Sequence, residues 1–297
     1  QGATKFTMIA VLTGSIANAI LDPIMIYGMD LGIEGAAIAT VISLCINMAL
    51  YIGYIAKKKG VLRFSVRNIA LSKTIYAEVL KIGIPVLLFQ LLASTAMGSI
   101  NTAAKPYGDY AVAAMGAVIR IMTVVTYVVF GFLKGFQPFA GYNYGAKKYE
   151  RLKKSIRLCM IWSTAFCIFA AIVLFIFADP VVSLFGTDVK MIDLAAKALR
   201  LNAVLFITFG FQMVYASLYL AIGKSLIGSI LSLSRQGIFF FPLVFALPHL
   251  LGLTGVIWVQ PMADLLTTIL TVIFAVKINR TLSAEVERGD QLGIRKI

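Results

Sequence analysis

Apolar runs of about 20 residues or more recur along the whole sequence, and they constrain the fold more than any other feature. Each run is long enough to cross about 30 Å of hydrocarbon as an α-helix. Inside a bilayer the backbone polar groups must be paired internally, which a helix achieves within one segment. The sequence therefore predicts an all-α integral membrane protein with eight transmembrane helices, at residues 6–27, 33–56, 82–104, 110–133, 156–178, 198–222, 226–248 and 253–276.

The charge distribution predicts how these helices are oriented. Only 13% of residues are charged, whereas a soluble domain has about 25%. The net charge of +14 does not indicate nucleic acid binding, because 21 of the 27 Lys and Arg residues fall on one side of the predicted topology and four on the other. Since basic connections stay in the cytoplasm, we expect a multi-pass protein of the cell membrane with both termini cytoplasmic.

Asp22 is a carboxylate inside a membrane-length apolar run. An ionised side chain in hydrocarbon costs at least ~2.5 kcal/mol, so it normally faces a protein interior, a water-filled cavity or a cation. Asn18 lies four residues earlier on the same helical face, and Thr40 follows in the next run. These three residues are the candidate site for a coupling cation. The alternative is that Asp22 and Pro23 end a helix near the membrane surface.

An internal repeat predicts the domain organisation. The segment Gly32-Ile-Glu-Gly35 recurs as Gly252-Leu-Thr-Gly255, and Pro23 recurs as Pro242, so the offsets are 220 and 219 residues. Such a period is typical of transporters built from two parallel halves. By this symmetry, roughly four further helices of the same protein are expected before Gln1. The predicted parts are the last two helices of a first six-helix bundle at 1–56, a basic cytoplasmic linker at 57–81, a complete second six-helix bundle at 82–280 and a cytoplasmic tail at 281–297.

Three charged residues lie near the middle of later predicted spans. Arg235 and Asp264 fall in adjacent spans, where an ion pair would offset much of the burial penalty. They are therefore either a structural clasp, meaning an ion pair that only holds the two helices together, or part of a cavity. Arg120 is the third. Prolines are candidate helix kinks at positions Pro23, Pro85 and Pro242.

Polar and aromatic side chains in the second half are candidates for a substrate cavity, because they suit hydrophobic or cationic molecules, although core packing explains most such residues equally well. The candidates are Gln90, Phe209, Gln212, Tyr215 and Phe240. The three cysteines have no metal-like spacing, and His249 is the only histidine. We therefore predict no cofactor, no catalytic residue and no metal site beyond one for Na⁺.

Several motifs together resemble the multidrug and toxic compound extrusion (MATE) transporters, over nearly the whole chain. They are Asn18-Ala-Ile-Leu-Asp22-Pro23, Gly32-Ile-Glu-Gly35-Ala-Ala-Ile-Ala-Thr40, Gly135-Phe-Gln-Pro138, Gly141-Tyr-Asn-Tyr-Gly145-Ala146, Ala221-Ile-Gly-Lys224 and Arg235-Gln-Gly237.

The resemblance implies twelve helices in two bundles, alternating access, and export of organic cations or other amphipathic compounds driven by entry of H⁺ or Na⁺. It also implies that Asn18, Asp22 and Thr40 form the cation site. The helices at 82–104 and 198–222 lack the acidic residues that some relatives carry there. A bacterial or archaeal membrane is the expected location.

Three functions remain open at this stage. A cation-coupled antiporter explains the polar site in the first span, with a small amphipathic or cationic substrate and the lipid bilayer as partners. A flippase for lipid-linked oligosaccharide precursors is the first alternative, and it would need more cationic residues in its cavity than Arg120 and Arg235. A membrane enzyme or assembly factor that transports nothing is the second alternative.

Overall fold

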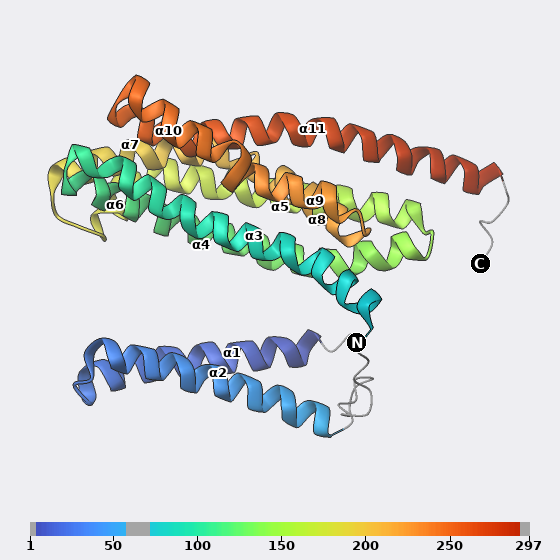
Figure 1. The fold of residues 1–297 in the computed structure, drawn as a ribbon, viewed down its shortest axis with the longest axis horizontal. Helices are drawn as coiled ribbons and strands as arrows, with labels where there is room; N and C mark the ends of the chain where they lie inside the picture. Colours follow the sequence, from blue (N-terminus) through green and yellow to red (C-terminus); the bar gives the residue numbers. More distant parts are fainter. Residues whose placement is uncertain (1–3, 58–71, 292–297) are drawn as a thin grey trace. The chain divides into compact units, whose positions relative to one another are not determined.

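The computed structural model describes residues 4–57 and 72–291, and every regular element in these ranges is helical (Figure 1). The chain divides into two compact units, Gln1–Lys73 and Thr74–Ile297. Helices are expected throughout, because in a bilayer the backbone N–H and C=O groups of the apolar runs can form hydrogen bonds only with each other. The all-α prediction is therefore confirmed for the described residues.

The first unit is a helical hairpin formed by α1 (Thr4–Pro23), the π-helix η1 (Ile24–Gly28) and α2 (Gly32–Ala56). The proline nitrogen of Pro23 has no hydrogen to donate, and at this residue the α-helix gives way to the π-helix. The chain then reverses through Asp30 and Gly32, which both have positive φ. Next to the turn, a Cβ on Gly35 would lie 2.7 Å from the carbonyl oxygen of Met25, so glycine permits the two segments to approach closely.

The second unit is a bundle of longer and shorter helices. Its elements in chain order are α3 (Lys73–Ala104), η3 (Lys105–Tyr107), α4 (Asp109–Gly145), α5 (Tyr149–Ile176), α6 (Ala178–Ser183), α7 (Val189–Phe206), α8 (Phe209–Ala221), α9 (Ser225–Leu233), η4 (Ser234–Ile238), α10 (Phe240–Leu251) and α11 (Leu253–Gln291).

Six helical segments of the described residues are long and apolar enough to span a membrane, or seven if the bent pair α7 and α8 is one span. The remaining predicted span, 82–104, lies in α3, where the side chains at 78, 81, 82, 85 and 86 are outside the described residues. The kink predicted at Pro85 falls among these. The structure thus supports a membrane protein with at least six spans in its described part.

Two predicted spans are interrupted. The segment 198–222 bends by 51° between α7 and α8, and the segment 226–248 contains the π-helix η4 just before Pro242. A π-helix and a sharp bend both leave backbone groups without regular partners, and such irregularities are tolerated at membrane depth where protein surrounds them. Within the predicted linker α3 begins at Lys73, and within the predicted tail α11 continues to Gln291. Residues 58–71 lie outside the described residues.

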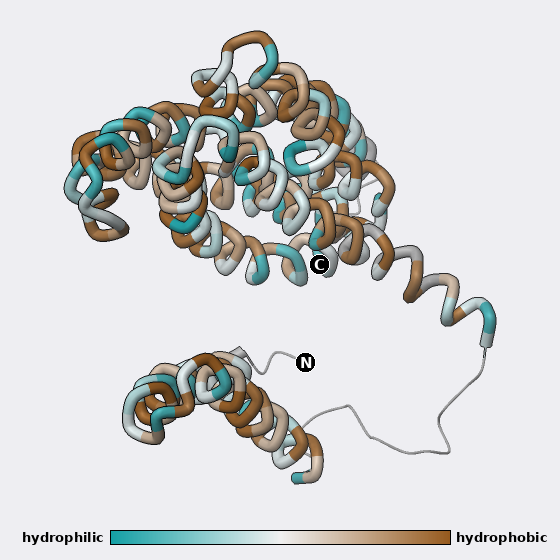
Figure 2. The backbone as a smooth tube through the Cα atoms, turned by 60° about the vertical axis from the view of Figure 1, so that its left-hand side comes forward, coloured by the Kyte–Doolittle hydropathy of each residue, from teal (hydrophilic) through white to brown (hydrophobic). Residues whose placement is uncertain are grey.

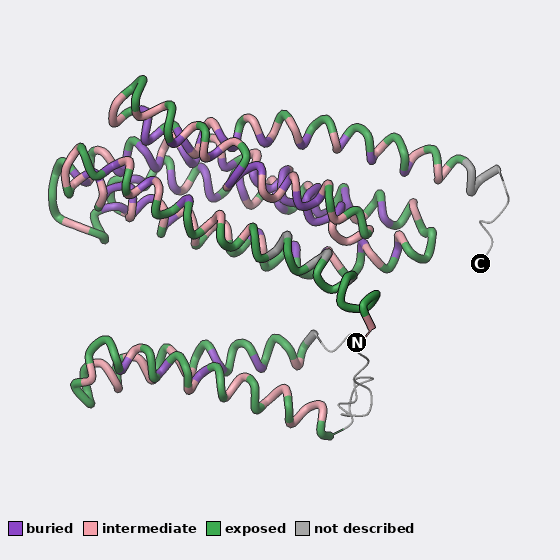
Figure 3. Tube along the Cα trace, in the orientation of Figure 1, coloured by how far each residue is buried: buried purple, intermediate pink, exposed green. Residues whose placement is uncertain are grey.

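The core of the second unit consists of two clusters of buried apolar residues. One is rich in alanine, including Ala111, Ala195 and Ala198, which allows helices to pack closely. The other is built around larger side chains, including Phe206, Phe209 and Tyr219. Figure 3 shows the buried residues gathered along the inward faces of the helices, and Figure 2 shows hydrophobic residues continuing around the outside. Exposed apolar side chains such as Trp162 and Phe169 on α5 suit contact with lipid.

Candidate functional site

Asn18 and Asp22 are brought together on α1. The Asn18 Nδ2 donates a hydrogen bond to the Asp22 Oδ1 at a distance of 3.2 Å, and both residues are half-buried. Their spacing of four residues places them one helical turn apart, so local helix geometry is enough to form the pair.

Thr40 is not joined to this pair by a hydrogen bond in the described part of the chain. Its residue is exposed on α2, and its hydroxyl donates to the carbonyl oxygen of Ala36 at 2.9 Å. This bond uses the hydroxyl hydrogen and leaves the oxygen able to accept a bond or to face a cation. Two of the three predicted cation-site residues are therefore in contact, and the third is exposed on the neighbouring helix of the hairpin.

Sequence reasoning missed two polar residues on α2. Ser43 is buried and donates to the carbonyl oxygen of Ala39, and the buried Asn47 Oδ1 has no described hydrogen-bond partner. A Cβ on Gly14 would lie 3.3 Å from the Asn47 Cβ, so Asn47 packs against α1 one turn before Asn18. The spacing of Thr40, Ser43 and Asn47, three and four residues apart, was a signal that could have revealed this polar stripe.

Arg235 and Asp264 form a buried ion pair between η4 and α11. The Arg235 Nε lies 2.7 Å from the Asp264 Oδ1, and the side chains are only 10% and 5% exposed. A second contact joins the Arg235 Nη2 to the Asp264 Oδ2 at 3.3 Å, and Gln260 donates to the same carboxylate at 2.8 Å. The guanidinium carbon also lies 4.6 Å from the centre of the Phe209 ring. Paired on one side and stacked on the other, Arg235 has the geometry of a structural clasp.

Gln212 ties α8 to α11 beside this clasp. Its Nε2 lies 2.9 Å from the carbonyl oxygen of Asp264 and 2.7 Å from the Thr268 Oγ1, while its buried Oε1 has no partner among the described residues. Tyr215 accepts a hydrogen bond from Asn279 at 2.7 Å. These buried polar side chains connect neighbouring helices, because a hydrogen bond between two of them replaces the hydrogen bond that each would otherwise make to water.

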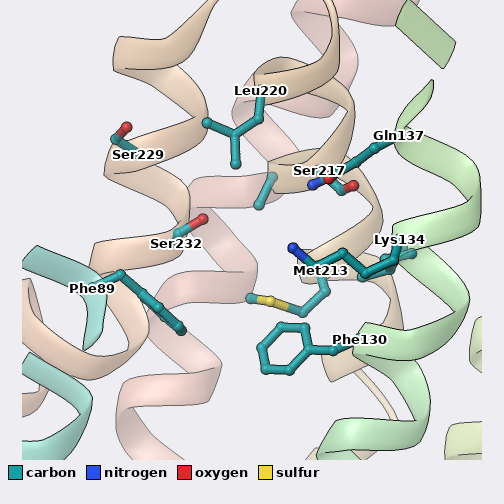
Figure 4. Close-up of a pocket in the computed structure, with 11 residues that line it drawn as sticks. Phe89, Phe130, Lys134, Gln137, Met213, Ser217, Leu220, Ser229 and Ser232 are labelled. Atoms are coloured by element: carbon teal, nitrogen blue, oxygen red, sulfur yellow. The ribbon is translucent and has the colours of Figure 1, made fainter. Parts of the chain in front are cut away.

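The other cavity candidates differ in burial. Phe209, Tyr215 and Phe240 are buried in helix packing, whereas Gln90 and Arg120 are exposed. Two cavities lie between helices of the second unit, and neither is lined by any of the predicted cavity residues, which are Gln90, Phe209, Gln212, Tyr215 and Phe240. One, of about 160 Å³, lies among α3, α4, α8 and α9 (Figure 4), and the other, of about 740 Å³, lies among α3, η3 and α10. Within the described residues, no group of three or more His, Cys, Asp or Glu side chains is placed to hold a metal ion.

A hairpin and a bundle of membrane-length helices, with polar residues inside them, define a helical membrane protein. The chain superimposes on a MATE protein crystallised in a bent conformation with a TM-score of 0.83, at 24% identity, covering 98% of this chain and 64% of that one. It is similarly close to an outward-facing multidrug resistance MATE family transporter, with a TM-score of 0.82 at 24% identity, covering 94% and 63% of the two chains.

The MatE family model matches residues 85–246, more than half of the sequence, and the chain belongs to this family. The multidrug export protein MepA of Staphylococcus haemolyticus is 28% identical over 96% of this chain and 62% of its own length. MepA of Staphylococcus aureus is 30% identical over 86% of this chain and 56% of its own length. The chain thus spans about three fifths of the length of these relatives.

Proposed function

We propose that this protein is part of a cation-coupled antiporter that exports amphipathic or cationic small molecules. The observation that carries the proposal is the Asn18–Asp22 hydrogen bond on a membrane-length helix, since a carboxylate there has a functional role by default. The two MepA relatives are multidrug export proteins, which supports an exported substrate and favours a transporter over an enzyme.

In this proposal Asp22 binds the coupling cation, Na⁺ or H⁺, on one side of the membrane and releases it on the other. Hard cations prefer oxygen ligands, and the carboxylate of Asp22, the amide oxygen of Asn18 and the hydroxyl oxygen of Thr40 are of that type. In the structure the amide nitrogen of Asn18 faces Asp22. Binding of a cation between the two residues would require the Asn18 amide to turn its oxygen toward the cation.

We expect a transmembrane gradient of one cation to drive export by the full-length protein in vesicles. An imposed Na⁺ gradient and an imposed proton gradient are applied separately, and efflux of ethidium is followed by fluorescence. One of the two gradients should accelerate efflux over protein-free vesicles, and collapsing it with an ionophore should remove the effect. Equal efflux with and without either gradient would refute cation coupling.

We propose that the connection between α4 and α5 faces the cytoplasm, because of its excess of basic residues. Lys148 is exposed in this connection, and Lys190 is exposed at the start of α7, on the opposite side of the predicted topology. In a background without the native cysteines, Lys148→Cys should react with an impermeant maleimide only after the cells are opened. Lys190→Cys should react in intact cells. The reverse pattern would invert the orientation.

The flippase alternative gains no specific support from the geometry. It needs cationic side chains free to hold a diphosphate, and Arg235 is already paired with Asp264. Arg120 is exposed on α4 and lines neither of the two cavities.

A further inference from the structure

The cavity among α3, α4, α8 and α9 has an apolar wall suited to one aromatic ring. Its volume is about 160 Å³, and an engineered apolar cavity of ~150 Å³ is enough to bind benzene. Phe89 and Phe130 line it and meet edge to face, with ring centres 6.4 Å apart. Met213, which also lines the cavity, has a flexible side chain that adapts to different ring substituents.

The polar groups on the α4 side of this cavity have unused hydrogen-bond donors. Lys134 and Gln137 are three residues apart on one face of α4, and Figure 4 shows both side chains extending into the cavity. Among the described residues no carboxylate pairs with Lys134, and no hydrogen bond engages either side chain. Ser217 on α8 also lines the cavity, and its buried Oγ lacks a partner in the described ranges.

The opposite wall differs, because its hydroxyl hydrogens are already used. Ser229 donates to the carbonyl oxygen of Ser225 at 2.6 Å, and Ser232 donates to that of Gly228 at 2.9 Å. The residues that line the cavity include one ammonium group, that of Lys134, and no carboxylate. An organic cation would therefore meet a like charge here, whereas an acid would meet a counter-charge and free donors.

We propose that this cavity is a subsite for the carboxylate and ring of an aromatic acid, either an amphipathic anion or the acidic end of a zwitterion. Lys134 supplies the counter-charge, Gln137 supplies an amide donor, and Phe89 and Phe130 receive the ring. The inference rests on the proposed export function, since it adds a class of molecule to what the protein carries. An anionic lipid headgroup offers the same acceptor chemistry. The alternative is that Lys134 only extends its ammonium group toward the membrane surface, and in that case the cavity would bind anionic, neutral and cationic ligands equally well.

Three fluorinated ligands of nearly equal size test the proposal: 4-fluorobenzoate, 4-fluorobenzamide and 4-fluorobenzylamine. Their binding to the full-length protein in phosphatidylcholine nanodiscs is measured by fluorine NMR at neutral pH. The carboxylate should bind at least about tenfold more tightly than the amide or the amine, because a charge-assisted hydrogen bond contributes more than a neutral one. Lys134→Met should remove this preference, and Lys134→Arg should keep most of it.

The matched control is Lys154→Met, which removes an exposed cytoplasmic-side lysine of α5 that does not line the cavity and should leave the preference unchanged. Adding phosphatidylglycerol to the nanodiscs distinguishes the two sources of the anion. If the lipid displaces 4-fluorobenzoate, the site exists and an anionic lipid headgroup occupies it. If binding of 4-fluorobenzoate is unchanged, the site exists and selects a soluble acid. Equal affinity for the three ligands, or a preference that survives in Lys134→Met, overturns the proposal.

Binding at equilibrium needs no gradient, so this test separates the inference from the proposed function. A protein that prefers the carboxylate but shows no gradient-driven efflux refutes the export function alone. A protein that exports ethidium but binds the three ligands equally refutes the subsite alone.

Discussion

Asp22→Asn is expected to reduce gradient-driven export by the full-length protein to the level of protein-free vesicles. The substitution keeps the size of the side chain and a hydrogen bond within reach of Asn18, but it removes the carboxylate to which the proposed function assigns cation uptake and release. Folding stability should change by no more than about 1 kcal/mol, since one hydrogen bond to a charged group is replaced by one between amides. Efflux of ethidium in vesicles measures the first effect, and thermal unfolding in detergent measures the second.

Asp30→Asn is the matched control for this prediction. Asp30 is an exposed acid of the same hairpin, it lies in the turn before α2, and the same substitution removes one negative charge there. Asparagine also tolerates the positive φ of 55° at this position. Export should therefore be nearly unchanged in Asp30→Asn. If Asp22→Asn exported normally at normal abundance, Asp22 would have no role in coupling.

The presence of the helices could be predicted from the sequence, but their ends and breaks could not. Run length and hydropathy identify a membrane helix because the bilayer imposes both. The same rule says nothing about residues beyond the hydrocarbon, so α4 continues to Gly145 although its predicted span ends at 133. The bend between Phe206 and Phe209 depends on which helices pack around it, and no proline marks it in the sequence.

The candidate sites could likewise be predicted where residues are close in the sequence, and could not be predicted where they depend on how helices pack. Asn18 and Asp22 are neighbours because they are four residues apart on one helix, which the sequence states directly. Asn47 was missed because its environment depends on the packing of α2 against α1 at Gly14. In the sequence Lys134 is one of the basic residues that indicate the topology, and a basic residue at a membrane boundary has the same sequence pattern whether or not it enters a cavity.

Aromatic residues show the limit most clearly. Phe209 and Phe240 are predicted residues of a substrate cavity and are buried in the structure, whereas Phe89 and Phe130 line the cavity among α3, α4, α8 and α9. All four are the same residue type in similar apolar runs, and burial in a core and exposure to a cavity both favour an aromatic ring. Only the arrangement of helices in space separates the two environments.

Removing one partner of the buried ion pair is expected to destabilise the protein strongly. Asp264→Ala leaves the guanidinium of Arg235 buried against the Phe209 ring without a counter-charge, and it removes the acceptor of Gln260. An unpaired buried charge of this kind costs about 3–5 kcal/mol. Unfolding of the full-length protein in detergent, followed by tryptophan fluorescence, should show a loss of this size for Asp264→Ala.

Two further variants decide whether the pair is a structural clasp. The double variant Arg235→Met with Asp264→Leu should recover most of the lost stability, because apolar side chains of similar volume replace a buried ion pair at little net cost. Asp193→Ala breaks the exposed pair with Lys197, whose side chains are 64% and 65% exposed, and should cost no more than about 0.5 kcal/mol because solvent screens that pair. If the double variant recovered its stability and also exported normally, Arg235 and Asp264 would act as a clasp alone. Recovery of stability with loss of export would instead assign the pair a part in transport.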